Sequence, residues 1–512
     1  MVVVLYIFVA LLAPISAASV PLWPLPSVYS VGTASFVLSP SFSFYSVSEH
    51  KSYVLEAGIK RYSTLIGSNS VSSSDNNIIQ GCDIKVESIL STLQEELDSL
   101  NDYSVDTSYS LDIDQSGKCL VQAKTVWGSL YAMETFTQLL TRESSVALNY
   151  IPVSIQDTSR YAHRGVLIDT SRHYLSKSKI LQIIDTLVMQ KFNILHWHIV
   201  DAQSFPLDST SAPNIVKGAY SPNLIYSLDV INEIMTYAAY RGVRILFEVD
   251  IPGHAASWNA GYPAIMADCF EKYYYNINDF ALNPTIDETY SVVNSILGDI
   301  INSTKSKYIH LGGDEVVYGC WNEDAEIVDF MATNNIASYN ELLNYFVTKV
   351  DKQVNSMGAS VVHWEEVFFA GVEVSNSNTI YEVWTNSSQV AKVTSANFNV
   401  IAAPSDVWYL DHLSTTWKTM YAYDPTTGLD DTQAKYILGG ETCLWGEYID
   451  DSNFIQTAYP RASAVAERLW SPSTVVDQVD ALARLTIQRC RMLARGHESA
   501  PVQPDACLVN YV

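Results

Sequence analysis

Two adjacent carboxylates, Asp314 and Glu315, follow the short apolar segment 308–313 (YIHLGG). Neighbouring side chains of a regular strand point to opposite faces, so two acids that serve one ligand fit best where a strand breaks into a loop. Gly312 and Gly313 permit such a break, because glycine adopts backbone conformations closed to other residues and lets a ligand approach closely. A lone pair of acids is equally compatible with a solvated strand end. The choice depends on the rest of the chain.

From Arg160 onward the chain repeats a strand, a loop and a helix. Helical spacing follows most of the strands, as in Lys179–Gln190, Ser227–Arg241, Asp287–Ile301 and Asn340–Val354. Apolar strands that alternate with helices imply a parallel sheet, and eight such units imply an α/β fold of the (β/α)8 TIM-barrel type. The expected strands are Gly165–Asp169, Ile194–Val200, Arg244–Val249, Tyr308–Leu311, Val361–Trp364, Thr379–Trp384, Asn399–Ala403 and Tyr436–Gly439.

Acids and aromatic residues gather at the carboxyl ends of these strands, where TIM-barrel enzymes carry their active sites. Carboxylates bind hydroxyl groups and move protons, and aromatic rings pack on the apolar faces of sugars, so the combination is typical of a carbohydrate site. Chance places some polar residues beside loops, but not this many acids and indoles together. The ends read Asp169, Asp201, Asp250 with His254, Asp314-Glu315, Trp364-Glu365, Trp384, Trp408 to Asp411, and Trp445 with Glu447.

The domain organisation predicted from these patterns has three parts. Residues 1–18 resemble a signal peptide, because the unbroken apolar run Val2 to Ala13 is short for a bilayer span and small residues up to Ala18 follow it. Residues 19–158 contain alternating short apolar runs and an amphipathic pattern at Trp127–Leu140, which predicts a small non-catalytic α+β domain. Residues 159–512 form the catalytic barrel, closed by a last helix at Val479–Arg495.

Composition excludes several classes of partner. A formal charge of −25 argues against nucleic acid and anionic membrane surfaces, since both require a basic face. No later segment approaches the length of a transmembrane helix, so no membrane span is expected. The chain should enter the secretory pathway and reach a lysosome or the extracellular space.

Seven cysteines fit an oxidising compartment, and none lies in a CxxC pair. The number is odd, and Cys443 lies inside an apolar strand, which makes it the candidate for a buried free thiol. The other six, paired with their neighbours along the chain, would give Cys82–Cys119, Cys269–Cys320 and Cys490–Cys507, although sequence alone cannot fix connectivity. Asn302 and Asn386 begin N-glycosylation acceptor sequences.

From about His163 to its carboxyl end, the chain resembles the β-N-acetylhexosaminidases of glycoside hydrolase family 20. The markers are 163–174 (HRGVLIDTSRHY), 196–198 (HWH), 250–254 (DIPGH), 310–315 (HLGGDE), 408–411 (WYLD), 445–448 (WGEY) and 466–470 (AERLW). The resemblance implies an exo-acting retaining enzyme that removes terminal GlcNAc or GalNAc from glycans. In this family the nucleophile is the 2-acetamido oxygen of the substrate, which gives an oxazolinium intermediate. It implies no cofactor and no metal.

The same resemblance implies a role for each matching residue. Glu315 would protonate the leaving oxygen and then activate water, while Asp314 would hold the acetamido N–H. Repulsion between the two carboxylates is expected to keep Glu315 protonated in mild acid. The substrate-binding residues would be Arg164 and Glu447 on the sugar hydroxyls, Trp364, Trp384 and Trp445 around the acetamido group and ring, Tyr409 on the acetamido oxygen, Asp411 on an outer hydroxyl, and Asp201 and His254 behind the acid.

The resemblance also bears on the charge of the sugar that is accepted and on the oligomeric state. Relatives that accept sulfated or sialylated sugars tend to carry Asn-Arg where this chain has Asp411-His412, so neutral terminal sugars are expected here. Family members are often dimers, which makes a homodimer possible. The sequence does not distinguish a glycoprotein glycan, a glycolipid or a chitin oligomer as the substrate.

Three alternatives remain open at this stage. A conventional retaining glycosidase would use a protein carboxylate, such as Glu365 or Glu447, as its nucleophile. A lectin would bind sugar in the same pocket, although an acid beside the scissile bond would then have no use. His196 and His198 share a strand face and could hold a metal with Asp201 and Asp250. Arg172 and Asp169 are interpreted as a structural ion pair beneath the site.

Overall fold

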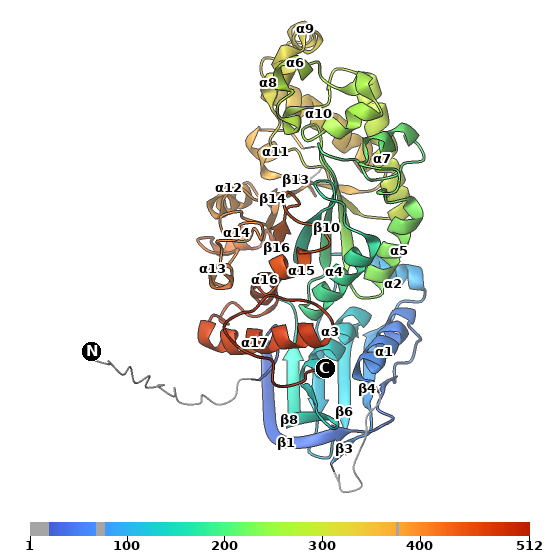
Figure 1. Ribbon diagram of the computed structural model, residues 1–512, viewed down its shortest axis with the longest axis vertical. Coiled ribbons are helices and arrows are strands. Elements are labelled where there is room, and N and C mark those ends of the chain that lie inside the picture. Colours follow the sequence, from blue (N-terminus) through green and yellow to red (C-terminus); the bar gives the residue numbers. More distant parts are fainter. Residues whose placement is uncertain (1–19, 68–76, 375–377) are drawn as a thin grey trace, which may run out of the picture.

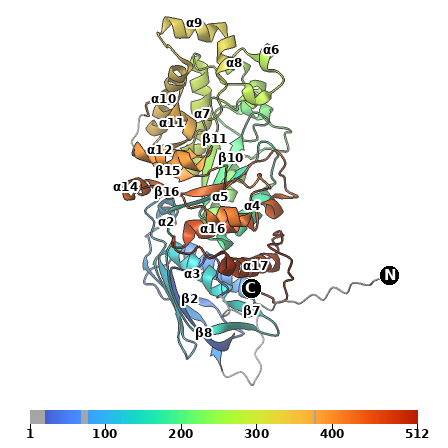
Figure 2. The same ribbon diagram turned by 90° about the vertical axis from the view of Figure 1, so that its left-hand side faces the viewer.

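The computed structural model describes residues 20–67, 77–374 and 378–512. The segment predicted to be a signal peptide lies outside these residues. In Figure 1 a β-sheet of N-terminal residues, coloured blue to cyan, occupies the lower end, and the barrel, coloured green to red, lies above it. Figure 2 shows the same stacking from the side.

The N-terminal sheet has eight described strands in the order β2-β4-β6-β5-β8-β1-β3, and β7 pairs with β8. Buried and exposed positions alternate along β4, as expected for a strand with one face in a core. The strands are β1 (Val28–Leu38), β2 (Phe44–Ser46), β3 (Ile78–Ile79), β4 (Cys82–Ser88), β5 (Tyr109–Ile113), β6 (Cys119–Thr125), β7 (Leu140–Arg142) and β8 (Val146–Asp157). Helices α1 (Tyr53–Ile66), α2 (Leu93–Ser99) and α3 (Val126–Gln138) accompany them.

Helix α3 is buried along its whole length, so the amphipathic helix predicted for this segment is not what the structure shows. It packs on the sheet, and its Tyr131 side chain contacts the barrel. There the Tyr131 hydroxyl accepts from Arg164 at 2.9 Å, and the Tyr131 ring packs edge-on against Trp470. The interface also holds an ion pair between the buried Lys191 Nζ and Asp157 Oδ2 at 3.0 Å. Helix propensity patterns miss such burial, because it depends on two partners far away in the sequence.

Eight parallel strands close the barrel in the order β9 to β16, and β16 pairs back with β9. They are β9 (His163–Asp169), β10 (Ile194–Val200), β11 (Arg244–Val249), β12 (Tyr308–His310), β13 (Ser360–Trp364), β14 (Ile380–Val383), β15 (Asn399–Ala402) and β16 (Ile437–Leu444). The predicted (β/α)8 fold is confirmed. Two strands have the predicted bounds, and β16 continues to Leu444, beyond the predicted end at Gly439.

Helices surround the barrel and join its strands (Figure 1). The longer ones are α4 (Lys177–Met189), α5 (Leu228–Ala239), α7 (Asp287–Thr304), α9 (Ala325–Thr333), α10 (Tyr339–Ser356), α16 (Arg461–Trp470) and α17 (Gln478–Ala494). The shorter ones are α6 (Phe270–Tyr273), α8 (Tyr318–Glu323), α11 (Glu365–Phe369), α12 (Val390–Ser395), α13 (Trp417–Ala422), α14 (Asp431–Ala434) and α15 (Phe454–Ala458).

The three predicted disulfides are present. Cys82–Cys119 joins register partners on β4 and β6, Cys269–Cys320 links the loops that follow β11 and β12, and Cys490–Cys507 ties α17 to the last residues of the chain. Cys443 is a buried free thiol, as predicted. Asn302 and Asn386 are both exposed, as glycosylation of their acceptor sequences would require.

Charged and polar side chains fill part of the barrel interior, which the sequence did not suggest. Glu382 on β14 is fully buried, and neither of its oxygens has a hydrogen-bond partner. Burial, and then the neighbouring Glu441, raise the pKa of Glu382 well above its ordinary value. A raised folded-state pKa means that this group supports the fold at acidic pH and that its contribution is lost as the pH rises through that pKa.

We therefore expect Glu382→Gln to stabilise the protein at pH 7 but not at pH 4. The amide imitates the protonated acid and cannot ionise, so it avoids burying a charge whose neighbours His196 and His310 lie 3.6 Å from Oε2, too far for a hydrogen bond; a buried polar group without a hydrogen bond costs about 1–3 kcal/mol. The measurement is the melting temperature of wild type and variant across this pH range, with the exposed Glu373→Gln as control. Equal shifts at both pH values would contradict the prediction.

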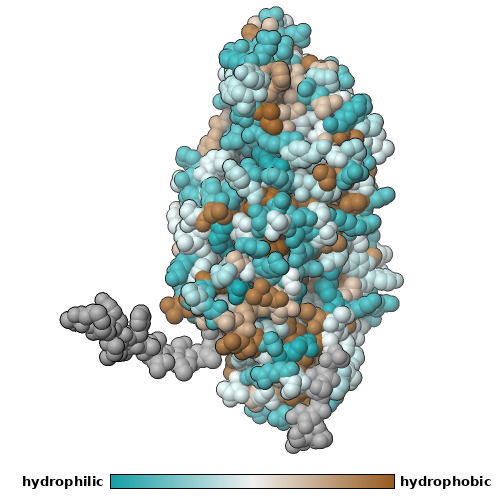
Figure 3. Space-filling model, in the orientation of Figure 1, coloured by the Kyte–Doolittle hydropathy of each residue, from teal (hydrophilic) through white to brown (hydrophobic). Residues whose placement is uncertain are grey.

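On the face shown in Figure 3, polar residues cover most of the surface and apolar residues form small separate patches. Among the described residues, no helix has both the length and the apolar character needed to cross a bilayer.

Candidate active site

The carboxyl ends of the barrel strands surround a cavity of about 170 Å³. Nine of the predicted site residues line it, and they come from the ends of seven strands, β10 to β16, or from the loops that follow them. The lining residues are Arg172, His198, Asp201, Asp250, His254, Asp314, Glu315, Trp364, Trp384, Tyr409, Trp445 and Glu447. Residues more than 250 positions apart in the sequence therefore meet here because parallel strands end at one rim.

The two glycines break strand β12 as predicted. Gly312 and Gly313 have φ values of +62° and +95°, which side chains rarely adopt. A Cβ on Gly312 would lie 1.7 Å from Asp250 Oδ1, and the Gly313 N–H donates to that same oxygen at 3.0 Å. Glu315 itself has a φ of +47°, in the strained left-handed region. This bend turns Asp314 inward and Glu315 toward the mouth of the cavity.

Asp314 is buried, and its Oδ1 has no hydrogen-bond partner. Burial raises the pKa of Asp314 well above its ordinary value, and the nearby Asp250 carboxyl raises it further. Burial also raises the pKa of Asp250 to about 6. An inward-facing oxygen without a partner is available to a ligand donor.

Glu315 has the opposite environment, with 59% of its side chain exposed. The His254 imidazole, with Nε2 3.5 Å from Glu315 Oε2, lowers the pKa of Glu315. The expectation that repulsion from Asp314 keeps Glu315 protonated is therefore wrong for the free protein. The two acids diverge, and the same histidine nitrogen lies 3.8 Å from Asp314 Oδ2, between them.

A buried carboxylate, Asp201, holds the histidine that contacts Glu315. Its Oδ1 lies 3.1 Å from His254 Nδ1, and its Oδ2 lies 2.9 Å from Arg172 Nη2. Burial would raise the pKa of Asp201, but the charges of His254 and Arg172 lower it well below its ordinary value. Burial likewise opposes charge on His254, yet Asp201 and Asp250 raise its pKa well above 6.5. The pair therefore carries opposite charges.

Four aromatic rings form one side of the cavity. Trp384 stacks against Tyr409 with ring centroids 6.2 Å apart, and Trp445 lies 6.1 Å from Trp364 and 6.3 Å from Tyr409. The Trp384 indole donates to both oxygens of Glu366 at 3.0 Å. The sequence did not predict this contact of Glu366, because the helical pattern of α11 does not show which of Glu365 and Glu366 faces Trp384.

The comparisons with known proteins identify this arrangement. Residues 161–473 match the model described as "Glycosyl hydrolase family 20, catalytic domain", and residues 22–139 match "beta-acetyl hexosaminidase like". The chain belongs to glycosyl hydrolase family 20. It is therefore a glycoside hydrolase, and the resemblance seen in the sequence is confirmed.

Relatives match this family 20 chain over nearly its whole length. Beta-hexosaminidase 3 of Arabidopsis thaliana is 35% identical over 522 residues, which cover 96% of this chain and 94% of the relative. Human beta-hexosaminidase subunit beta is 36% identical over 502 residues, covering 95% and 89%. The structure of Flavobacterium johnsoniae chitobiase superposes with a TM-score of 0.79 at 25% identity, covering 91% of this chain and 71% of that one. These relatives make the chain an enzyme of the β-hexosaminidase type.

Arg164 does not lie in the family 20 site, so the role predicted for it is wrong. It is fully buried at the start of β9, where its guanidinium donates to the carbonyls of Tyr161 and Lys191 at 2.7 and 2.9 Å. The strand runs away from this point toward the active-site rim. Arg172, which follows the end of β9, lines the cavity instead, and its guanidinium lies 5.2 Å from the Trp445 ring. Its position after the strand end was the signal that could have identified it.

Asp411 lies beside the family 20 cavity but not among its lining residues. Its Oδ2 is 3.8 Å from His412 Nε2, and its buried Oδ1 has no hydrogen-bond partner. Burial raises the pKa of Asp411, and the nearby Glu447 adds to that effect. Asp411 is therefore placed at the rim, next to a lining acid.

Two of the alternative interpretations lose support from the geometry. Glu365 is buried, its Oε1 accepts from the Thr385 hydroxyl, and it does not line the cavity, so it has no access to a sugar as a nucleophile. His196 and His198 each lie between two carboxylates, and Asp201 is paired with Arg172. Three of the four residues considered for a metal are thus engaged in ion pairs, and the fourth, Asp250, accepts from the Gly313 N–H.

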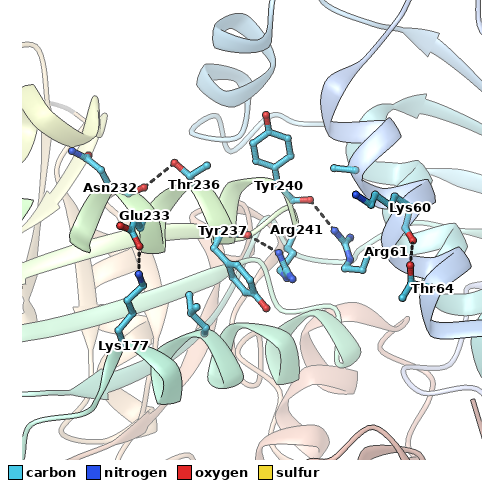
Figure 4. Close-up of a pocket in the computed structure, with 12 residues that line it drawn as sticks. Lys60, Arg61, Thr64, Lys177, Asn232, Glu233, Thr236, Tyr237, Tyr240 and Arg241 are labelled. Atoms are coloured by element: carbon cyan, nitrogen blue, oxygen red, sulfur yellow. Dashed lines mark hydrogen bonds and ion pairs between the residues drawn. The ribbon is translucent and has the colours of Figure 1, made fainter. Parts of the chain in front are cut away.

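A larger cavity lies elsewhere, between α1 of the N-terminal domain and helices α4 and α5 (Figure 4). Its volume is about 860 Å³, yet it contains no pair of acids beside aromatic rings. Its charged groups bind one another, as Lys177 binds Glu233, or bind helix carbonyls, as Arg61 binds Tyr240. Size alone does not mark the active site of this enzyme.

Proposed function

We propose that the cavity binds one terminal β-linked N-acetylhexosamine and that Asp314 and Glu315 hydrolyse its glycosidic bond with the substrate's own acetamido oxygen as nucleophile. The observation that carries this proposal is the contrast between the two adjacent acids. Asp314 lines the cavity together with the aromatic rings, and its Oδ1 has no hydrogen-bond partner. Glu315 lies at the mouth of the cavity beside the charged His254. One acid can thus hold the acetamido group while the other serves the leaving group.

In the first step the acetamido carbonyl oxygen attacks the anomeric carbon, and the bond to the leaving oxygen breaks. Glu315 gives that oxygen a proton, and the sugar becomes an oxazolinium ion. Asp314 accepts a hydrogen bond from the acetamido N–H, and the growing positive charge of the sugar favours its ionised form, which burial disfavours in the free protein. In the second step water attacks the anomeric carbon and Glu315 takes its proton. Each step inverts the configuration at the anomeric carbon, so the product retains the configuration of the substrate.

His254 supports both steps. In the free protein it is charged, lies 3.5 Å from Glu315 Oε2 and favours the ionised form of that acid, so Glu315, 59% exposed, takes up from solvent the proton that the leaving oxygen needs. When Glu315 gives up its proton, the charged histidine stabilises the carboxylate that acts next as base. Asp201 keeps the imidazole oriented through its bond to Nδ1.

The remaining lining residues fix the sugar. Arg172 offers forked donors to ring hydroxyls, the role first expected of Arg164, and Glu447 accepts from hydroxyls on the same side. Trp364, Trp384 and Trp445 pack on the acetamido methyl and the ring faces. The Tyr409 hydroxyl donates to the acetamido oxygen and aims it at the anomeric carbon.

The substrates proposed are glycoprotein, glycolipid or chitin-derived glycans that end in neutral GlcNAc or GalNAc, and the proposed location is a lysosome or the extracellular space. Three disulfides support an oxidising compartment. We also propose a homodimer, because family members are often dimers.

Hydrolysis of aryl β-GlcNAc, β-GalNAc and β-glucoside between pH 3 and 8 tests the proposed reaction. Cleavage of only the two acetamido sugars is the expected result, because a glucoside has no internal nucleophile. Comparable cleavage of the glucoside would favour a protein nucleophile, with Glu447 as the accessible candidate. Sugar binding without any cleavage would mean a lectin.

Charge at the rim should decide whether sulfated sugars are accepted. Asp411→Asn combined with His412→Arg removes one negative charge and adds a positive one beside Glu447. We expect kcat/KM for an aryl 6-sulfo-β-GlcNAc to rise about 10–100-fold, since a hydrogen bond to a charged group contributes about 1.5–3 kcal/mol. The unsulfated substrate is the control, and a double variant without gain on the sulfated one would disprove the role of Asp411.

A further inference from the structure

We propose that Glu248, a buried carboxylate on β11 that touches no substrate, is the positioning residue that fixes both halves of the active site at once. Its Oε1 accepts a hydrogen bond from Trp364, which lines the acetamido pocket. Its Oε2 is the first atom in a series of contacts that ends at Glu315. The inference rests on the proposed function of Asp314 and Glu315 and adds a residue to it.

The first half of the arrangement concerns Trp364. Glu248 is fully buried in the barrel, and its Oε1 accepts from the Trp364 indole N–H at 2.7 Å. The His310 Nδ1 lies 3.3 Å from the same oxygen. Trp364 ends β13 and lines the cavity, so the bond to Glu248 fixes the plane of an indole that must pack on the substrate.

The second half runs from the other oxygen to Glu315. Glu248 Oε2 lies 2.6 Å from His198 Nδ1, and His198 Nε2 lies 2.7 Å from Asp201 Oδ2. Asp201 Oδ1 then lies 3.1 Å from His254 Nδ1, whose Nε2 faces Glu315 at 3.5 Å. Acid and base alternate along this line, so each group has an oppositely charged or hydrogen-bonding neighbour on both sides.

Charge explains why a carboxylate is needed at position 248. Burial would lower the pKa of His198, but Glu248 and Asp201 raise it well above 6.5. Burial would likewise raise the pKa of Glu248, but His198 and His310 lower it well below its ordinary value. Glutamine in place of Glu248 has a single oxygen, which can accept from Trp364 or from His198 but not from both. A neutral residue also leaves His198 without the charge that keeps it protonated.

A matched control exists in the same barrel. Glu441 on β16 is equally buried and also binds two histidines, with Oε2 2.9 Å from His163 Nε2 and Oε1 2.5 Å from His196 Nδ1. Among the described residues, no bond joins Glu441 to Trp364, His198 or any residue that lines the cavity, and its link to Glu248 runs only through His196, whose Nε2 lies 3.1 Å from Glu248 Oε2. Loss of either carboxylate should lower stability, but only loss of Glu248 should disturb the site.

The experiment compares Glu248→Gln, Glu441→Gln and wild type by melting temperature and by kcat and KM for aryl β-GlcNAc. We expect kcat to fall about 10–100-fold in Glu248→Gln alone, because small displacements of catalytic groups cost about that much. Binding of a thiazoline analogue of the cyclic intermediate should weaken about tenfold in the same variant. Equal losses in both variants, or full activity in Glu248→Gln, would overturn the proposal.

A second variant keeps the test valid if Glu248→Gln does not fold. In His198→Asn the amide nitrogen occupies the place of Nδ1 and still donates to Glu248, while the link from Nε2 to Asp201 is cut. We expect kcat to fall and KM to change little, because Trp364 keeps its partner. Unchanged kcat in a folded His198→Asn would also overturn the proposal. Absence of wild-type cleavage, by contrast, would count against the proposed function and not against Glu248.

Discussion

Glu315→Gln should lower kcat for an aryl β-GlcNAc with a poor leaving group by about 10²–10⁴-fold, the usual contribution of a general acid–base residue. Glutamine keeps the size of the side chain but has no proton to give and no charge with which to take one. The loss should be smaller for a dinitrophenyl leaving group, which departs without protonation. Steady-state kinetics with a series of aryl leaving groups measures how kcat depends on the pKa of the leaving group in wild type and variant.

Two observations would separate this effect from a general disturbance of the loop. The exposed Glu326→Gln, on the following helix α9, should leave kcat unchanged. Added azide should restore part of the Glu315→Gln activity on the dinitrophenyl substrate, because an anionic nucleophile needs no base in the second step. A variant that loses the same factor with every leaving group would show that Glu315 is not the acid.

Asp314→Asn should lower kcat for the same substrate by about 10²–10³-fold, the usual cost of removing one electrostatic stabiliser of a transition state. Asparagine still offers an oxygen to the acetamido N–H, so the loss isolates the negative charge that faces the oxazolinium cation. KM should change less than kcat, since the neutral substrate gains little from that charge.

Substrates with mono-, di- and trifluoroacetamido groups extend this measurement. Each fluorine weakens the acyl oxygen as a nucleophile, so wild-type kcat should fall steeply along the series. If kcat did not depend on fluorine content, the acetamido oxygen could not be the nucleophile.

Strand–loop–helix repetition was enough to predict the barrel, because β10 and β11 are short, mainly apolar segments bounded by turn residues. The acids at 314 and 315 were predictable for a related reason, since their glycines mark the break of a strand. Arg164 and Arg172 show the limit of such reasoning. Both belong to one motif, and only the direction of β9 tells which of the two reaches the rim.

The electrostatic environment of the site was less predictable than its membership. Adjacent acids suggested mutual repulsion, but the backbone at Glu315 turns the two side chains apart and His254 lies between them. Asp201, which follows β10, binds His254, and Glu248 on β11 binds His198. These residues meet only because the barrel is closed. Pairings of this kind depend on tertiary packing, which residue spacing does not encode.

The contact between the sheet and the amino end of the barrel limits how this enzyme can be divided. Lys191 has 1% of its side chain exposed, and its ammonium depends on Asp157 and on the Tyr109 hydroxyl, both from the N-terminal sheet. Arg164 depends in the same way on Tyr131. A barrel produced without residues 20–158 would lose the carboxylate that pairs with Lys191 and the Tyr131 hydroxyl that accepts from Arg164, and it would open this interface to water. Asp157 of the N-terminal domain therefore acts as the counterion of a lysine in the catalytic domain, so recombination or truncation between the two would break a buried ion pair.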